Sequence, residues 1–121
     1  MVLILTEDTK DDTDWVPFEI RYAVDECGIP ILAAYPGYAC IVNPRAPGTA
    51  RLWPKALAAR IESGDGHVLH VPFQEKPLTV AIGQFTHNNL PSNGVNYYLP
   101  SEYQKWGVCS RCMEPSCLEP R

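Results

Sequence analysis

The chain has 121 residues, of which 45% are apolar and 20% charged, so its composition is that of one globular domain and excludes a disordered or fibrous chain. Ten basic against fourteen acidic residues give a net charge of −4, without the basic stripe that nucleic-acid-binding proteins need. No apolar run is long enough to span a bilayer, and no leader precedes the first predicted strand. We therefore expect a cytoplasmic protein that binds neither nucleic acid nor membranes, and its odd number of cysteines, five, suits a reducing compartment.

The chain opens with a predicted central strand followed by an acidic loop. Residues 2–5 form a continuous apolar run, as expected of a strand covered on both faces. Residues 6–14 carry five carboxylates opposed by one lysine, which predicts a solvated polar loop. Cation binding is the alternative, but the run lacks the central glycine and terminal glutamate of a calcium loop. Thr13 and Asp14, at its end, are both suitable helix caps.

A helix over residues 15–27 is the best-marked element of the sequence. Its apolar positions recur every three or four residues, which places them on one side of the helix. That predicted buried side consists of Trp15, Phe18, Tyr22, Ala23 and Cys27. Gly28 follows as the residue that ends the helix. Residues 29–35 are again apolar, so strand, helix and strand together predict a right-handed unit with two parallel strands.

Weaker signals follow the second strand. Residues 37–50 hold two prolines and two glycines without a periodic pattern and predict a long loop, of a length that is often functional. We expect a helix over 52–61, a third strand over 67–73 and a closing helix over 78–85.

Beyond Thr86 the sequence predicts turn-rich chain, a segment between residues 97 and 106 that packs back, and a loose tail. The predicted fold is an α/β domain over residues 1–107, with a short parallel sheet and flanking helices. A cysteine-containing flexible tail is expected over 108–121.

Glu19 is the candidate residue for chemistry. Helical geometry places it one turn after Trp15 and one turn before Ala23, so we expect it to face partly inward. A carboxylate in an apolar setting loses hydration, which proteins rarely accept without a purpose. The alternative is that Glu19 complements the helix dipole at the edge of the core, for about 0.3 to 1 kcal/mol.

One motif spans the first two predicted strands. The strand V-L-I-L-T is followed by the polar loop, by W-V-P-F-E-I-R-Y-A from Trp15, and by the strand I-P-I-L from Ile29. This order resembles the later half of Toll/interleukin receptor (TIR) domains, and in particular the bacterial branch that includes the Thoeris antiphage sensors. The clear likeness covers residues 2–36, and a looser one, through H-V-P-F from His70 and A-I-G-Q-F, extends to about residue 85. The resemblance implies a flavodoxin-like fold.

The resemblance also implies an activity. In catalytic TIR-like proteins the glutamate of this motif is required to split NAD between nicotinamide and ribose; here that role falls on Glu19, with Trp15 as the aromatic neighbour that fixes the helix entry. A carboxylate beside the reacting ribose stabilises an oxocarbenium-like transition state, so NAD is the substrate and no metal or other cofactor is needed. Either ADP-ribose or a cyclised relative is the product.

Tyr35 and Tyr38 flank the carboxyl end of the second strand, where open parallel sheets bind ligands. They are candidates for stacking on a nicotinamide or adenine ring, with packing in the core as the alternative.

The sequence departs from the family at its start. TIR domains open with a strand, commonly F-I-S-Y, then a helix, a second strand and the loop that helps cradle the nucleotide, and all of these would precede Met1. The sequence therefore corresponds to a fragment, to a domain completed by another chain, or to a half-domain with another role. An interior strand at a sheet edge leaves apolar surface uncovered, so we expect a homo-oligomer or assembly with other TIR-like chains.

Three functions are compatible with the resemblance. The first is NAD cleavage, as a glycohydrolase or cyclase of bacterial antiphage or immune signalling. The second is a non-catalytic TIR-like interaction module. The third is an enzyme similar to nucleoside deoxyribosyltransferases, which act on the same type of N-glycosidic bond.

The cysteines and histidines suggest a metal site less strongly. Cys109 and Cys112 have the spacing of half a zinc site and Cys117 offers a third thiolate, but the fourth ligand is missing locally. A histidine or a second chain would have to complete the site, so we favour free thiols. His67 and His70 lie three apart in a predicted strand, point to opposite faces, and are expected to be structural or surface residues.

Overall fold

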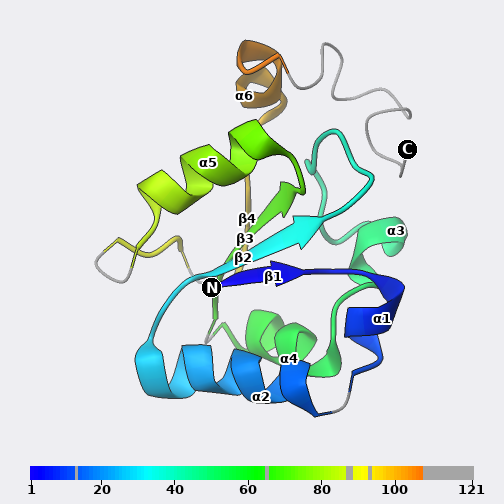
Figure 1. Ribbon diagram of the computed structural model, residues 1–121, viewed down its shortest axis with the longest axis vertical. Coiled ribbons are helices and arrows are strands. Elements are labelled where there is room, and N and C mark those ends of the chain that lie inside the picture. The colour runs from blue at the N-terminus through cyan, green and yellow to red at the C-terminus, as the bar shows by residue number, and fades with distance from the viewer. Residues whose placement is uncertain (13, 65, 87–88, 93, 108–121) are drawn as a thin grey trace.

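The computed structural model places a four-stranded parallel sheet between helices (Figure 1). The structure describes residues 1–12, 14–64, 66–86, 89–92 and 94–107. The strands, which pair in the order β1-β2-β3-β4, are β1 (Val2–Ile4), β2 (Ile31–Tyr35), β3 (His67–Pro72) and β4 (Gly94–Tyr97). The predicted α/β class with a short parallel sheet and flanking helices is therefore confirmed. β4 lies in a stretch where only turns were expected.

Helices cover both faces of this sheet (Figure 1). α2 (Trp15–Arg21), which continues into the π-helical η1 (Tyr22–Cys27), and α4 (Lys55–Ser63) lie on one face. α5 (Glu75–Gln84) lies on the other face. Successive side chains of a strand point to opposite faces of the sheet. Each strand that lies between the two helical layers can therefore contribute side chains to the core on both faces.

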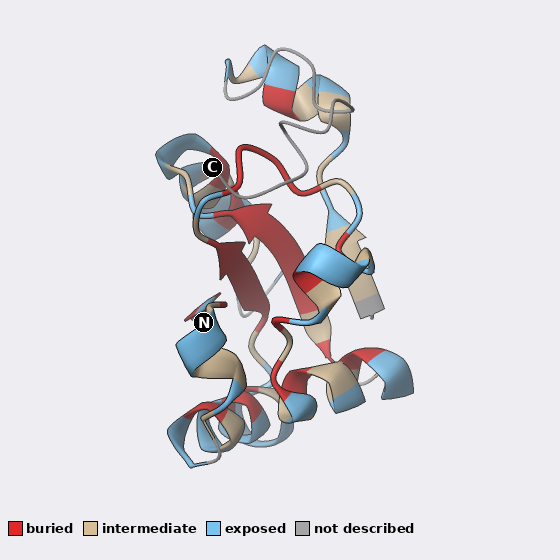
Figure 2. Ribbon diagram, turned by 90° about the vertical axis from the view of Figure 1, so that its right-hand side faces the viewer, coloured by how far each residue is buried: buried red, intermediate tan, exposed pale blue. Residues whose placement is uncertain are grey.

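Two layers of apolar side chains form the core. On the face of α2 and α4, Ala33 packs in one cluster with Ile20 and Leu57, and all three are completely buried. On the other face, Ala34 and Ala81 are completely buried in a second cluster. β2 is buried along its whole length, which explains its unbroken apolar sequence. Figure 2 shows the buried central strands and the exposed outer sides of the helices.

Three short helices lie in the connections. They are α1 (Glu7–Lys10), α3 (Pro47–Ala50) and α6 (Pro100–Lys105). Tyr103 of α6 is buried in a cluster with Ala39, and its hydroxyl donates to the carbonyl oxygen of Ile41 at 3.0 Å. The expected return of residues 97–106 onto the fold is therefore confirmed, and the predicted loop over 37–50 contains α3.

The acidic segment after β1 contains a short helix where a loop was predicted. The hydroxyl of Thr6 accepts the N–H of Thr9 at 3.3 Å, and the hydroxyl of Thr9 accepts the N–H of Thr6 at 2.7 Å. This reciprocal capping stabilises α1 despite its length of one turn. At the start of α2, the carboxylate of Asp12 accepts the N–H of Asp14 at 2.8 Å, whereas the side chain of Asp14 makes no capping bond. Thr13 lies outside the described residues.

The long helical stretch ends at the residue predicted for it. Gly28 follows η1 in the left-handed conformation, with φ of 61°, and donates its N–H to the carbonyl oxygen of Ala23. A side chain at this φ would be strained, which is why glycine suits the position.

The remaining predicted elements are present with shifted bounds. The helix expected over 52–61 is α4, the strand expected over 67–73 is β3, and the closing helix expected over 78–85 is α5. Within the described ranges, no helix combines the length and the apolar character that crossing a membrane requires. The predicted tail over 108–121 lies outside those ranges.

Candidate functional site

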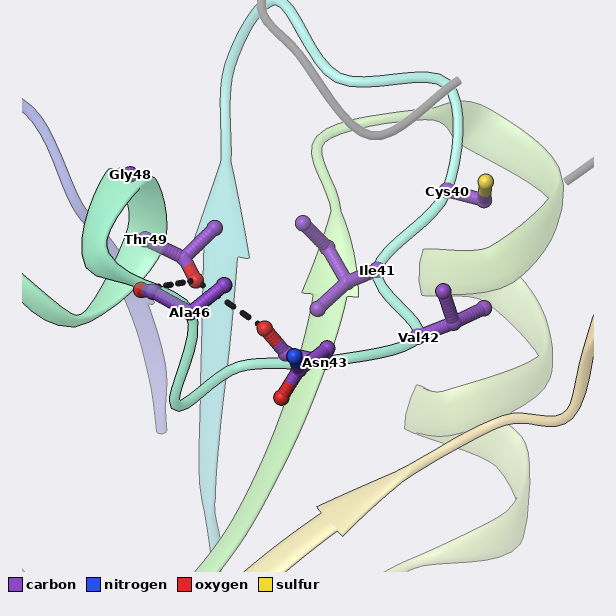
Figure 3. Close-up of a pocket in the computed structure, with 7 residues that line it drawn as sticks. All are labelled: Cys40, Ile41, Val42, Asn43, Ala46, Gly48 and Thr49. Carbon is purple, nitrogen blue, oxygen red and sulfur yellow. Dashed lines mark hydrogen bonds between the residues drawn. The ribbon is translucent and has the colours of Figure 1, made fainter. Parts of the chain in front are cut away.

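A cavity lies in the loop after β2, at the carboxyl edge of the sheet, where α/β proteins usually bind ligands (Figure 3). Its volume is about 270 Å³, and its lining comprises Cys40, Ile41, Val42, Asn43, Ala46, Gly48 and Thr49. The hydroxyl of Thr49 donates to the carbonyl oxygen of Pro44 at 2.8 Å, which ties the loop to α3. None of the lining residues is charged, and the volume is below the usual range of ligand pockets. The cavity is therefore small and carries no charged side chain among its lining residues.

Tyr35 and Tyr38, the candidate stacking residues, are packed in the core. Their exposed fractions are 0% and 2%, and their rings meet edge to face with centroids 6.0 Å apart. The Tyr38 hydroxyl donates to the carbonyl oxygen of Gly48 at 3.3 Å. Neither ring offers an exposed face to a nicotinamide or adenine ring, so the structure supports the packing alternative for both.

Tyr35 also belongs to a buried hydrogen-bond chain that the sequence pattern does not reveal. The indole N–H of Trp53 donates to the Tyr35 oxygen at 2.9 Å, and this oxygen lies 2.6 Å from Nδ1 of His70. The rings of Trp53 and His70 stack with centroids 5.5 Å apart. Because the tyrosine oxygen accepts from Trp53, its own proton is directed at His70 Nδ1, and the proton of the neutral imidazole lies on Nε2. The chain joins β2, β3 and the loop before α4.

His70 is held neutral by its surroundings. It is completely buried, and its Nε2 has no hydrogen-bond partner among the described residues. Burial lowers the pKa of His70 to about 3, and the positive charge of Arg45 acts in the same direction. Burial also raises the pKa of Tyr35. Neutral groups without access to solvent contribute to stability and cannot reach a substrate, in agreement with the structural role expected for His70.

α2 and η1 bury a different side from the predicted one. Val16, Ile20 and Ala23 face the sheet, with exposed fractions of 8%, 0% and 2%. Glu19 is exposed and lies outside the cavity of the 40–49 loop, so its predicted inward position is wrong. The physical reason is that the helix carries two apolar sides with the same period, one aliphatic and one aromatic. The aliphatic side, which includes Val16 and Ile20, has the smaller side chains and packs against α4 and the strands.

The other apolar side of α2, together with the first residue of η1, forms an exposed row of aromatic rings. We call Trp15, Phe18 and Tyr22 the aromatic row; their exposed fractions are 69%, 48% and 53%. Trp15 meets Phe18 edge to face at a centroid distance of 6.2 Å, and Phe18 stacks on Tyr22 at 6.0 Å. Cys27 is exposed as well, so only Ala23 of the five side chains predicted to be buried on this helix is buried.

Two shallow hollows flank Phe18. The first has a volume of about 340 Å³ and is lined by Asp14, Trp15 and Phe18. The second has a volume of about 320 Å³ and is lined by Phe18, Arg21, Tyr22, Asp25 and Glu26. The aromatic row thus lies beside two hollows whose lining combines aromatic rings with carboxylates.

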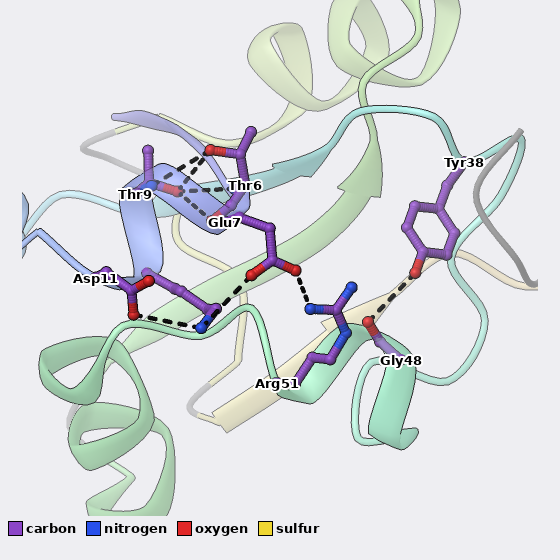
Figure 4. Close-up of polar contacts among 8 residues, drawn as sticks. Thr6, Glu7, Thr9, Asp11, Tyr38, Gly48 and Arg51 are labelled. Atoms are coloured by element: carbon purple, nitrogen blue, oxygen red, sulfur yellow. Dashed lines mark hydrogen bonds and ion pairs between the residues drawn. The ribbon is translucent and has the colours of Figure 1, made fainter.

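Two carboxylates of the acidic segment around α1, those of Glu7 and Asp11, are paired with cations (Figure 4). Glu7 forms a hydrogen-bonded ion pair with Arg51, and Lys10 approaches carboxylate oxygens of Glu7 at 3.5 Å and Asp11 at 3.3 Å. The hydrogen bond from Arg51 lowers the pKa of Glu7. In the part of the chain that the structure describes, no three His, Cys, Asp or Glu side chains are grouped to hold a metal ion. The three cysteines of the zinc alternative lie outside that part.

β1 forms one edge of the sheet, so the prediction of a central strand covered on both faces is wrong for residues 2–4. Its side chains Val2 and Ile4 are 42% and 40% exposed, whereas Leu3 is buried against the layer of α2 and α4. Since side chains alternate along a strand, Val2 and Ile4 belong to the face of α5. This uncovered apolar surface agrees with the expectation from the sequence; self-association through it stays a prediction.

No family model matches this chain, and neither a curated protein nor a solved structure matches it. The resemblance to TIR-like domains therefore stays a prediction carried by the motif between the first two strands. The functional conclusion depends on the geometry of the described residues.

Proposed function

We propose that this chain is an interaction module that docks another protein through the aromatic row of α2. The observation that carries the proposal is the exposure of three adjacent aromatic side chains on one helix. Contiguous exposed apolar side chains mark interaction sites in folded proteins, and aromatic residues supply much of the binding energy in interfaces.

The inner side of α2 explains why the aromatic row is available. Val16 and Ile20 already anchor the helix to the core, with Ile20 completely buried. The rings outside are therefore not needed to hold the helix in place, and their packing on one another through Phe18 orders them before any partner arrives. The resemblance to TIR-like domains is compatible with three functions, and a docking role is the one among them that needs no catalysis.

NAD cleavage places a demand on Glu19 that its surroundings do not meet. A carboxylate stabilises the developing positive charge of a ribose only when it lies beside the bound sugar in a site that excludes water. Glu19 is exposed, and the cavity at the carboxyl edge is lined by other residues. Cleavage of a deoxynucleoside by the same carboxylate would meet the same obstacle.

We therefore expect the purified chain to release no nicotinamide from NAD above the buffer rate, and Glu19→Gln to leave that rate unchanged. The measurement is nicotinamide by chromatography, at dilute and at high protein concentration, because assembly activates some enzymes. NAD turnover that disappears in Glu19→Gln would show that this residue is catalytic and would remove the docking role as the main function.

Site-specific photo-crosslinking in the native host tests the docking role. A photoreactive amino acid at position 18 is expected to capture a discrete partner, whereas the same group at Glu75, an exposed position on α5, captures none. The captured protein is then purified and its affinity is measured. We expect Phe18→Ala to weaken it by at least about tenfold, as for a central interface residue. Equal affinity for the variant, or no discrete product at position 18, contradicts the proposal.

A further inference from the structure

The charges around the aromatic row restrict the chemistry of its partner. Asp14 lines the first hollow and Glu26 the second. Glu19 follows Phe18 directly and is exposed one helical turn from Trp15. None of these three carboxylates forms an ion pair with a described residue.

The other two charged residues that line the second hollow are Arg21, which is a cation, and Asp25, which is already paired. Asp25 in the second hollow is neutralised by Arg60, whose Nη2 lies 2.7 Å from its carboxylate. Among the residues that the structure describes, Arg21 is the one cation that lines either hollow. The surface beside the rings therefore keeps an excess of negative charge.

We propose that the aromatic row binds a cationic segment of another protein, one that carries Lys or Arg beside apolar anchor side chains. The inference rests on the docking function proposed above and adds the chemistry of the partner. Two anchors enter the hollows on either side of Phe18, and the cations lie against Asp14, Glu19 and Glu26.

The two hollows lie close together, because Phe18 lines both of them. Side chains three or four residues apart on a helix are about 5 to 6 Å apart, so one helical segment can present two neighbouring anchors. We therefore take the cationic segment to be helical, with its apolar anchors at that spacing.

The same charges disfavour the other occupants. A second copy docked face to face through this row would bring its own carboxylates against Glu19 and Glu26, and like charges in an interface are costly. A nucleic acid would place its phosphates there and be repelled for the same reason. A cationic segment is attracted, and its attraction falls with added salt.

Selection from a randomised peptide library displayed on phage tests the inference with the intact chain as target and Phe18→Ala as counter-target. We expect the recovered peptides to be rich in Lys and Arg, with apolar residues three or four positions apart. A synthetic copy of the most enriched peptide should bind the native chain, by calorimetry, at least about tenfold more tightly than Phe18→Ala. The double variant Glu19→Lys/Glu26→Lys should weaken binding by a similar factor.

A matched pair of charge reversals separates local from overall electrostatics. Glu75→Lys/Glu102→Lys changes the net charge by the same amount on α5 and α6, and we expect it to alter the affinity by no more than about twofold, because distant charges are screened. Circular dichroism verifies that each variant is folded.

Each result has a distinct meaning. Neutral or acidic peptides that require Phe18, or peptides insensitive to Glu19→Lys/Glu26→Lys, would overturn the cationic partner and leave the docking role in place. Recovery of no peptide that prefers the native chain over Phe18→Ala would overturn both. Self-association by sedimentation that Phe18→Ala abolishes would identify a second copy as the occupant and overturn the inference.

Discussion

Lowering the pH from 7 to 5 is expected to reduce the free energy of unfolding by about 2 kcal/mol through His70 alone. The pKa of His70 is about 3 in the folded chain, against 6.5 for an exposed histidine. Between these two values the unfolded chain binds a proton that the folded chain does not, so the free energy of unfolding falls as the pH falls. The loss begins near pH 6.5, above the range in which carboxylates titrate. Urea denaturation at a series of pH values measures it.

The control for this prediction is His70→Asn. The asparagine carbonyl can still accept the Tyr35 hydroxyl, but the side chain does not titrate. We expect the variant to be less stable at pH 7, because it leaves space beside Trp53, and to lose less stability on acidification than the native chain. An unchanged pH dependence in His70→Asn would mean that another group causes the acid sensitivity and that His70 can take up a proton in the fold.

Ile20→Ala is expected to lower the free energy of unfolding by about 2 to 5 kcal/mol, the usual cost of such a truncation in a core. Ile20 is completely buried between α2 and the strands. Phe18→Ala, two residues earlier, removes a larger side chain but is expected to cost less than about 1 kcal/mol, because half of that ring is already in contact with solvent. Chemical denaturation followed by circular dichroism measures both.

This pair of variants tests the orientation of α2 directly. The two residues lie on the same helix and both are apolar, so a difference between them reports which side packs on the sheet. If Phe18→Ala were as destabilising as Ile20→Ala, the aromatic row would belong to the core, and its docking role would be lost together with the identity of its partner.

The first two strands could be predicted from the sequence because each is a continuous apolar run bounded by polar or turn-forming residues. The segments around Ile4 and Ala33 are both strands of the parallel sheet, but only β2 is buried on both faces, since Val2 and Ile4 of β1 are exposed at the sheet edge. Gly28 marks the end of the helical stretch because few other residues tolerate its backbone conformation. β4 was missed because its sequence, G-V-N-Y, includes an asparagine and a glycine and follows a turn-rich stretch.

The candidate site was harder to predict because periodicity does not choose between two apolar sides of one helix. Trp15 and Phe18 repeat as regularly as Val16 and Ile20, and the larger rings suggested the wrong side. The selection depends on the shape of the surface that the helix meets, which is formed by residues distant in the sequence, such as Leu57. The resemblance to TIR-like domains drew attention to Glu19 on this helix, whereas the docking role that we propose depends on its aromatic neighbours.

The buried chain at the end of β2 was not predictable for a similar reason. The three residues of this chain are distant in the sequence. Trp53 lies 18 positions after Tyr35, and His70 lies 35 positions after Tyr35. Nothing local distinguishes a tyrosine that binds a ligand from one that holds a strand end in place. Only the meeting of the three elements shows that these rings pack on one another in the core.

The rigid seating of α2 has a consequence for the speed of recognition. A helix fixed on its inner side presents rings whose positions are set before any encounter, so little conformational entropy remains to be lost when they are covered. A partner can then bind and leave without any local refolding, and the lifetime of the complex depends on how well the partner's own side chains fit. Such a surface would bind its proposed partner without the entropic cost of ordering its own rings.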